Sequence, residues 1–146
     1  MGADAATSVH ARSEDSKSFR KVVFEFGGYK IRYAWVSQCG YYPEDPNKAN
    51  QDAHVELENF ASSEGLKDMT LFGVFDGHGK TGDTCAHFAR DLLPTTLARE
   101  LGNMAEKGAL LDIASAYRTA FVEVNSKLHE RADCDDSMSG TTASTR

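Results

Sequence analysis

The spacing of hydrophobic and polar residues predicts a β-hairpin near the start of the chain. A stretch rich in β-forming residues runs from Phe19 to Phe26, and residues 29–36 alternate between large apolar side chains and charged or small ones. Gly27 and Gly28 separate the two stretches. Alternation with a period of two, interrupted by turn residues, is typical of two half-buried strands joined by a tight turn. We therefore predict a hairpin over these residues.

The period changes after Gly79, and the new period predicts two helices. Apolar residues now recur every three or four positions, which is the pattern of a helix with one face in a core. The first set comprises Cys85, Phe88, Ala89, Leu92, Leu93, Leu97 and Leu101, and the second set comprises Leu110, Ala114, Tyr117, Phe121, Val124 and Leu128. Pro94 is expected to strain or kink the first helix. Gly102 and Gly108 are expected to bracket the connection between the helices.

Three further segments have strand character, namely residues 51–57, 69–76 and 139–145. Strands followed by two helices and then another strand predict a segregated α+β sandwich and not a βαβ repeat. Residues 1–20 are small, polar and charged without a period, so we predict a flexible tail there. Residues 21–146 are then one domain. Because the chain ends inside a promising buried strand, we expect this domain to be incomplete and the natural chain to be longer.

Composition and charge narrow the classes of partner. The 146 residues are 40% hydrophobic and 26% charged, which is typical of a globular protein, and the formal net charge is −6. The sequence has no basic patch that would indicate nucleic acid as a partner. It also has no apolar run of about 18 residues that would indicate a membrane-spanning helix. The three cysteines are an odd number without CxxC spacing, which favours reduced thiols in the cytoplasm or nucleus. We expect a monomer.

The segment Leu71–Gly79 carries the most informative chemistry. An apolar strand ends here in Asp76, Gly77, His78 and Gly79, so a carboxylate, an unhindered backbone carbonyl and an imidazole come together. Oxygen donors of this kind suit Mg²⁺ or Mn²⁺. The alternative is a turn in which Asp76 caps the following helix and the glycines relieve backbone strain. The tetrapeptide alone leaves both interpretations open.

Three other residues are candidates for the same site. Asp52 lies at the entry to the strand at residues 51–57 and is a second carboxylate, although an acid at such a junction is more often a turn residue. His78 can act as a general acid near neutral pH, as a metal ligand or as a surface residue. Lys48 can meet a phosphate as a point charge, although most isolated lysines are simply solvated.

Three motifs in series resemble one protein family. They are Asn50–Asp52, Val74–Gly79 and Ser139–Ala143, and the chain from residue 30 to residue 146 is similar to the N-terminal part of the metal-dependent type 2C protein phosphatases, the PPM family. The resemblance implies a four-layer α-β-β-α sandwich, present here only as its N-terminal part. It also implies Ser/Thr phosphatase activity on phosphoprotein substrates.

The resemblance assigns roles to individual residues. Two Mg²⁺ or Mn²⁺ ions would hold a hydroxide that attacks phosphoserine or phosphothreonine. Asp76 would bridge the two ions, Gly77 would offer its carbonyl to one of them, and Asp52 would bind the other. His78 would be the general acid for the leaving serine or threonine. Gln51 stands where many family members have a glutamate.

Two departures from the family pattern affect these expectations. Lys48 occupies the stretch in which many members have a phosphate-binding arginine, and it lacks the bidentate fork of a guanidinium. The family's later metal-binding acids lie beyond Arg146, so we expect this chain alone to bind metal weakly and to be a poor enzyme. The alternative function is a truncated or pseudo-phosphatase that binds phosphoproteins or regulates a partner without catalysis.

Overall fold

The computed structural model describes residues 18–26, 28–108 and 110–146. Its elements in chain order are β1 (Ser18–Phe26), β2 (Tyr29–Ser37), β3 (Asp52–Leu57), the short 3₁₀ helix η1 (Ser62–Glu64), β4 (Leu71–His78), α1 (Gly82–Glu106), α2 (Ile113–His129), β5 (Gly140–Thr141) and β6 (Ser144–Thr145). Most of the predicted tail lies outside the described residues. The part that is described, from Ser18 to Arg20, already belongs to β1.

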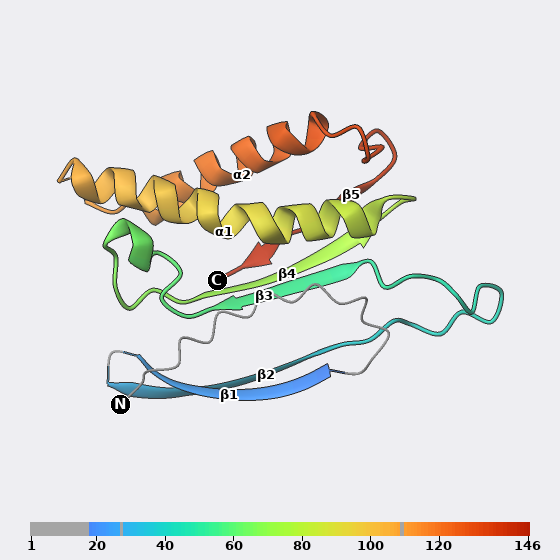
Figure 1. The fold of residues 1–146 in the computed structure, drawn as a ribbon, viewed down its shortest axis with the longest axis horizontal. Coiled ribbons are helices and arrows are strands. Elements are labelled where there is room, and N and C mark those ends of the chain that lie inside the picture. Colours follow the sequence, from blue (N-terminus) through green and yellow to red (C-terminus); the bar gives the residue numbers. More distant parts are fainter. Residues whose placement is uncertain (1–17, 27, 109) are drawn as a thin grey trace, which may run out of the picture.

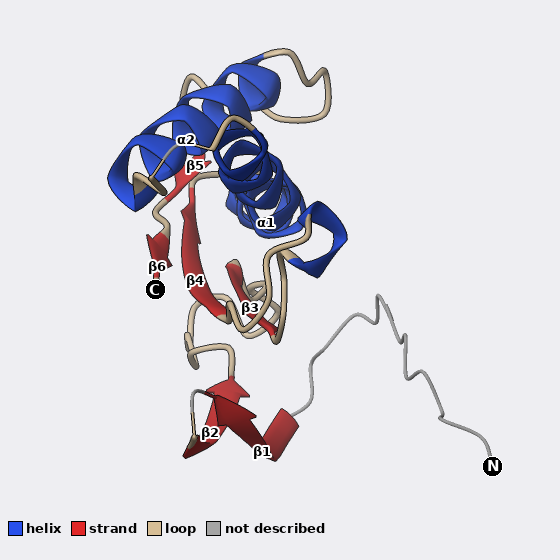
Figure 2. Ribbon diagram, turned by 90° about the vertical axis from the view of Figure 1, so that its left-hand side faces the viewer, coloured by secondary structure: helices blue, strands red, loops and turns tan. Residues whose placement is uncertain are grey.

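The described elements form three layers (Figures 1 and 2). The helices α1 and α2 cover one face of the sheet that contains β3 and β4, and the β1–β2 hairpin lies on the opposite side of that sheet. Two aromatic contacts join the hairpin to the sheet. Tyr33 meets Phe72 edge to face with their ring centroids 5.0 Å apart, and the Trp35 ring lies 4.0 Å from that of His54. The predicted α+β class is confirmed, as a helix layer, a sheet and a second β-layer.

The central strand of the larger sheet is β4. It pairs with β3 in antiparallel register along one edge, and with β5 and β6 along the other. The strand continues through the Asp-Gly-His motif to His78, two residues beyond its expected end at Asp76. The extension has a physical cause, since Gly77 and His78 pair with Thr141 and Gly140 of β5.

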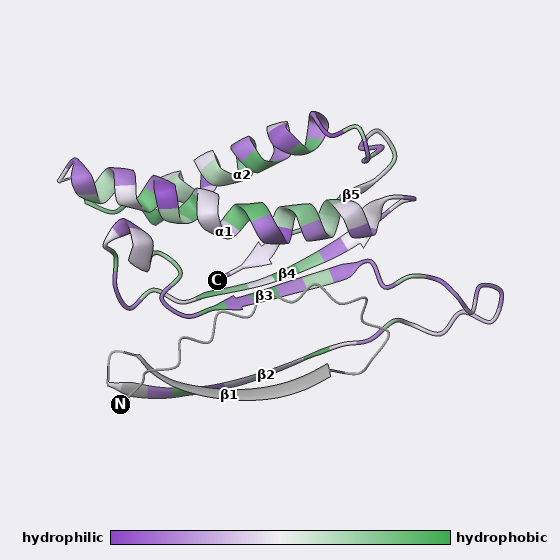
Figure 3. Cartoon of the chain, in the orientation of Figure 1, coloured by the Kyte–Doolittle hydropathy of each residue, from purple (hydrophilic) through white to green (hydrophobic). Residues whose placement is uncertain are grey.

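Alternation along β4 separates a core face from a face that points toward the hairpin. Leu71 and Phe75 are fully buried, whereas Val74 remains 58% exposed. The buried face packs against α1, where Leu93 and Leu97 complete the core. Green apolar colouring on α1 and along β4 marks this contact in Figure 3. Burying a side chain such as Phe75 contributes about 1.5–3 kcal/mol.

The helix α1 is longer than its sequence pattern predicted. It continues without interruption through Pro94 and through Gly102, so the expectation that Gly102 begins the interhelical connection is wrong. Gly102 is buried beneath η1, where an added Cβ would lie 2.7 Å from Cβ of Glu64. Close packing therefore explains this glycine. Neither helix in the described part of the chain has the length and apolar character needed to cross a bilayer.

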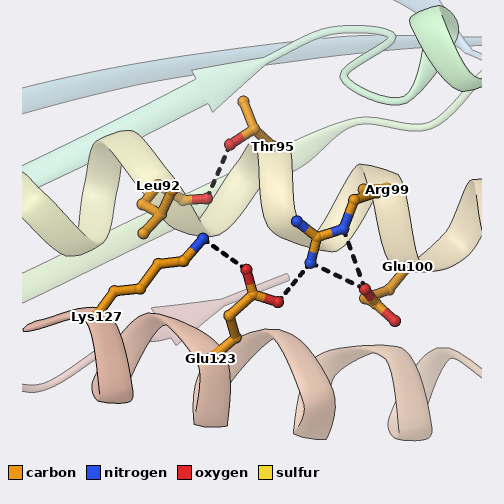
Figure 4. Close-up of polar contacts among 6 residues, drawn as sticks. All are labelled: Leu92, Thr95, Arg99, Glu100, Glu123 and Lys127. Atoms are coloured by element: carbon orange, nitrogen blue, oxygen red, sulfur yellow. Dashed lines mark hydrogen bonds and ion pairs between the residues drawn. The ribbon is translucent and has the colours of Figure 1, made fainter.

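The helix α2 packs against α1 through small residues and a surface ion pair. Ala116, Ala120 and Val124 are buried on its inner face. Glu123 receives hydrogen bonds from Arg99 of α1 and from Lys127, one turn further along α2, at 2.7 Å for the lysine (Figure 4). The helix begins after Asp112, whose carboxylate accepts a hydrogen bond from the backbone N–H of Ser115 at 3.0 Å.

Candidate functional site

Asp52 and Asp76 lie directly opposite each other in the antiparallel ladder of β3 and β4. Directly opposed residues point to the same face of a sheet, with their Cβ atoms about 4.5–5.5 Å apart. Both residues are exposed, and neither forms an ion pair with any described residue. Like charges in this position destabilise a sheet. The two carboxylates therefore form a concentrated negative site that a cation would stabilise.

The position of Asp52 is fixed by the residues before it. Asn50 accepts a hydrogen bond from the backbone N–H of Asp52 through its side-chain oxygen at 3.2 Å. The amide nitrogen of the same Asn50 donates to the hydroxyl of Ser37 at 2.7 Å. Asn50 thus forms an Asx-type turn that starts β3 and ties this start to the end of β2.

The backbone of Asp76 is held on its other side by Thr142. The N–H of Asp76 donates to the hydroxyl oxygen of Thr142 at 3.3 Å, and the N–H of Thr142 donates to the carbonyl of Asp76 at 2.9 Å. The contact joins residues 66 positions apart in the sequence. The Ser-Gly-Thr-Thr-Ala motif therefore has a local role, since its threonine fixes the strand that carries the second aspartate.

Gly77 is required by close backbone packing. Its N–H donates to the carbonyl of Gln51 at 3.2 Å. A Cβ at this position would lie 2.2 Å from the carbonyl oxygen of Gly82 and 2.5 Å from that of Gln51. Both neighbours are main-chain atoms, so no side-chain movement can relieve the clash. Gly77 allows β3, β4 and the start of α1 to converge beside the two aspartates.

The side chain of Gln51 closes the loop after the site, a role that the sequence analysis missed. Its Nε2 donates to the carbonyl of Gly79 at 2.6 Å. A glutamate here has no N–H to donate when ionised, so this contact needs the amide. Gly79 itself has a φ of +84°, which favours glycine. The signal in the sequence was only the glutamine in place of the family's usual glutamate.

His78 lies two residues after Asp76 on the same strand, so the two side chains share a face. His78 is exposed, and its ring lies against Gly140, where an added Cβ would be 3.2 Å from Nε2. No described residue forms a hydrogen bond or an ion pair with this ring. The imidazole is thus available to an incoming group.

Lys48 lies in the loop between β2 and β3. Its Nζ is 3.9 Å from the centroid of the Tyr42 ring, and its carbonyl accepts a hydrogen bond from the thiol of Cys39 at 2.9 Å. This cation–π contact holds the ammonium within its own loop. Its role toward a substrate phosphate stays a prediction.

The donors at this site fit part of a binding site for a hard divalent cation. Asp52 and Asp76 provide opposed carboxylates, and oxygen donors suit Mg²⁺ and Mn²⁺. The alternative in which Asp76 caps the next helix does not hold, because α1 begins after Thr81 and Asp76 lies within β4. Within the described ranges, however, no three or more residues of the types His, Cys, Asp and Glu form a group able to hold a metal.

Comparison with known proteins finds similarity to one family, protein phosphatase 2C. The family model for protein phosphatase 2C matches residues 45–145. The chain is 37% identical over 138 residues to "Probable protein phosphatase 2C 35" of Arabidopsis thaliana, which covers 92% of this chain and 36% of that protein. It is 32% identical to "Probable protein phosphatase 2C 14" of Oryza sativa subsp. japonica, over 85% of this chain and 30% of that protein.

The likeness extends beyond plants. "Protein phosphatase 2C homolog 2" of Schizosaccharomyces pombe is 34% identical over 100 residues, which is 65% of this chain and 24% of that protein. The chain therefore spans about a third of the length of these Arabidopsis thaliana and Oryza sativa relatives.

Proposed function

Because this chain belongs to the protein phosphatase 2C family, we propose that it contributes to the metal-dependent hydrolysis of phosphoserine and phosphothreonine in proteins, as part of a longer chain. The proposal rests on the family and on the pair of opposed aspartates at the end of β3 and β4. A phosphoprotein is the substrate class that the proposal implies.

The opposed carboxylates are the observation that carries the proposal. Asp52 and Asp76 would hold Mg²⁺ or Mn²⁺ on the exposed face of the sheet, with the carbonyl of Gly77 as a further oxygen donor. Such ions, when bound in pairs, supply Lewis-acid polarisation of a phosphoryl oxygen and an activated water. The hydrogen bonds that the side chains of Thr142 and Asn50 accept from the backbone N–H groups of Asp76 and Asp52 would keep the two aspartates aligned, because they fix the backbone of both.

His78 would serve as the general acid. Phosphoester cleavage needs a proton at the oxygen of the departing serine or threonine, and a protonated imidazole is a common general acid for such a step. The ring shares a face with Asp76 and is exposed. It forms no hydrogen bond or ion pair with the other described residues. These features favour a role toward a substrate over a structural role.

Two carboxylates are few for two divalent ions, so we expect residues 1–146 alone to bind metal weakly. The remaining ligands would come from a segment beyond this one. A non-catalytic binding module was the alternative function, but no feature of the described residues favours it, and it is not proposed.

The test uses the intact protein made from its natural transcript. We expect Asp76→Asn to weaken Mn²⁺ binding at least about tenfold in isothermal titration calorimetry, since it removes a charged ligand. It should also abolish Mn²⁺-dependent phosphate release from a phosphothreonine peptide. Asp68→Asn is the matched control. Asp68 is exposed, precedes β4 at its opposite end and has a φ of +57°, which asparagine tolerates.

Unchanged Mn²⁺ affinity in Asp76→Asn would reject the metal site. Mn²⁺ binding that depends on Asp76 without any phosphate release would retain the metal site and reject the phosphatase function.

A further inference from the structure

Two cysteines that are far apart in the sequence meet in the fold. Cys85 lies in the first turn of α1, and Cys134 lies in the loop between α2 and β5. Their sulfur atoms are 2.6 Å apart, although 49 positions separate the residues. Cys85 is completely buried and Cys134 is 8% exposed. Both are free thiols in this structure.

The loop that carries Cys134 is attached to the segment immediately after His78. The N–H of Thr81 donates to the hydroxyl oxygen of Ser139 at 3.1 Å, and the hydroxyl oxygen of Thr81 accepts from the N–H of Asp135 at 3.2 Å. The same hydroxyl lies 3.7 Å from the sulfur of Cys134. These few contacts hold residues 130–139 against the turn that follows the candidate site.

We propose that Cys85 and Cys134 are a redox-sensitive pair, which a peroxide converts into a reversible intramolecular disulfide that locks this loop against the start of α1. A disulfide has its sulfurs about 2.05 Å apart, so the two atoms need to approach by only about 0.5 Å. The cross-link would replace a set of weak hydrogen bonds with one covalent bond between two segments that flank the site.

A peroxide is the oxidant that forms the disulfide, and a dithiol is the reductant that reverses it. The sulfur of Cys134 attacks one peroxide oxygen, the O–O bond breaks, and a sulfenic acid and one water form. The thiol of Cys85 then attacks the sulfenic sulfur, the S–S bond forms, and the hydroxyl leaves with the Cys85 proton as a second water. Two thiols lose two electrons and the peroxide gains them. A dithiol returns both thiols by exchange.

The different surroundings of the two thiols set this order. Burial and the hydrogen bond with Cys134 raise the pKa of Cys85 to about 12, so that thiol stays protonated. Cys134 is 8% exposed, whereas Cys85 is completely buried, so Cys134 is the more accessible thiol and meets the peroxide first. Cys85 then acts as the resolving thiol, already in contact.

The test is a peroxide titration of the intact protein followed by alkylation and trypsin digestion. Trypsin places Cys85 in the peptide of residues 81–90 and Cys134 in that of residues 132–146. We expect hydrogen peroxide to produce these two peptides as one linked species that has lost two hydrogens, and dithiothreitol to separate them. Oxidation of Met138, in the second peptide, is not reversed by a dithiol and is thereby distinguished.

Variants identify the pair. The linked species should persist in Cys39→Ser and be absent from Cys85→Ser and from Cys134→Ser. Cys39 is the matched control, because it is a third free thiol in the loop between β2 and β3. Continued alkylation of both buried thiols at a peroxide dose that oxidises Cys39 would overturn the proposal. Linkage of either cysteine to Cys39 or to another chain would also overturn it.

The peptide analysis of the peroxide-treated wild-type protein tests the proposal even if a serine variant fails to fold. It is also independent of catalysis, so a protein without phosphatase activity can still form the cross-link.

Discussion

At the residue scale, the candidate site is positioned mainly by groups that do no chemistry themselves. Asn50 and Thr142 fix the backbone of the two aspartates through hydrogen bonds, and Gln51 holds the carbonyl of Gly79. Gly77 adds a steric requirement, since the carbonyl oxygens of Gln51 and of Gly82 occupy the space that a methyl group would need. The acids are therefore presented by a rigid backbone, which is what a metal site needs.

A substitution at Gly77 tests this packing directly. We expect Gly77→Ala to lower the free energy of unfolding of the intact protein by at least about 2 kcal/mol, because the new methyl group meets main-chain oxygens that cannot rotate away. Urea unfolding followed by circular dichroism measures the change.

The control for this substitution is Gly73→Ala, on the same buried face of β4. A Cβ there meets side-chain atoms of Val55 at 3.0 Å and Phe75 at 3.1 Å, and side chains can shift by a few tenths of an ångström. Gly73→Ala should therefore lower the free energy of unfolding by less than Gly77→Ala does. Equal costs for the two variants would mean that the carbonyl contacts at Gly77 do not constrain the site.

The sequence indicated which residues make up the candidate site, but it did not indicate the contacts that hold them in place. Asp52 and Asp76 were recognisable as candidates because each lies at a predicted strand boundary in a short motif. The hydrogen bonds from Gln51 to Gly79 and from Asp76 to Thr142 span 28 and 66 positions. Such contacts depend on the tertiary approach of distant segments, and so does the meeting of Cys85 with Cys134. Local periodicity contains no information about them.

At the element scale, the two helices are joined by burial of small side chains and by one charged cluster at the surface. Glu123 accepts hydrogen bonds from Arg99 and Lys127, and these two contacts lower the pKa of its carboxyl below the ordinary glutamate value, with the arginine as the larger cause (Figure 4). Because the cluster is at the surface, its contribution to stability is small and sensitive to salt.

The direction of the pKa shift of Glu123 predicts how stability depends on pH. A carboxyl whose pKa is lower in the folded state stabilises the fold above its unfolded pKa, which is about 4.3 for glutamate. That contribution is lost as the pH falls through the lower, folded value. Glu123→Gln should therefore reduce the unfolding midpoint near pH 6 and make it less dependent on pH in the acid range.

Denaturant midpoints measured from pH 6 down to pH 3, at low and high salt, test this expectation. Glu130→Gln is the control, as Glu130 is exposed and caps the end of α2 through its backbone only. A Glu123→Gln midpoint that follows the wild type at every pH would show that the cluster does not couple the helices. A difference that persists in 1 M salt would contradict its surface character.

The lengths of the elements show where pattern analysis fails. The helical period identified the presence of α1 and α2, and the alternation identified the hairpin. The predicted inner face of α2 was only partly right, because Leu110 lies before the helix and is 94% exposed, and Phe121 is 37% exposed. Gly102 was misinterpreted as a helix end because a glycine inside a helix is unusual, whereas packing beneath Glu64 requires one there. The strand β4 continued to His78 because β5, far along the chain, supplies its pairing partner.

At the scale of the whole molecule, the two faces of the β3–β4 sheet are covered unequally. The helix side is a closed core in which Phe75 and Leu97 are fully buried. The β1–β2 hairpin lies on the other side of the sheet (Figure 2). That side leaves Val74 58% exposed and includes the Trp35–His54 and Tyr33–Phe72 contacts. This face also carries Asp52, Asp76 and His78.

Trp35 is the single tryptophan of residues 1–146, so fluorescence of this segment can report on the attachment of the hairpin. We expect His54→Ala to shift the emission of Trp35 to longer wavelength, because the ring that lies 4.0 Å from the indole is replaced by solvent. The far-ultraviolet signal of the helices should be unchanged, since α1 and α2 pack on the other face. Loss of such an aromatic contact costs about 0.5–1.5 kcal/mol.

Val36→Ala is the matched control for the hairpin, since Val36 lies next to Trp35 on the outer face of β2 and is 66% exposed. It should leave the emission unchanged. If His54→Ala also leaves it unchanged, the hairpin is not held through this contact. If the helix signal falls together with the emission shift, the layers unfold as one unit, and the cover over the face with the two aspartates is as stable as the core.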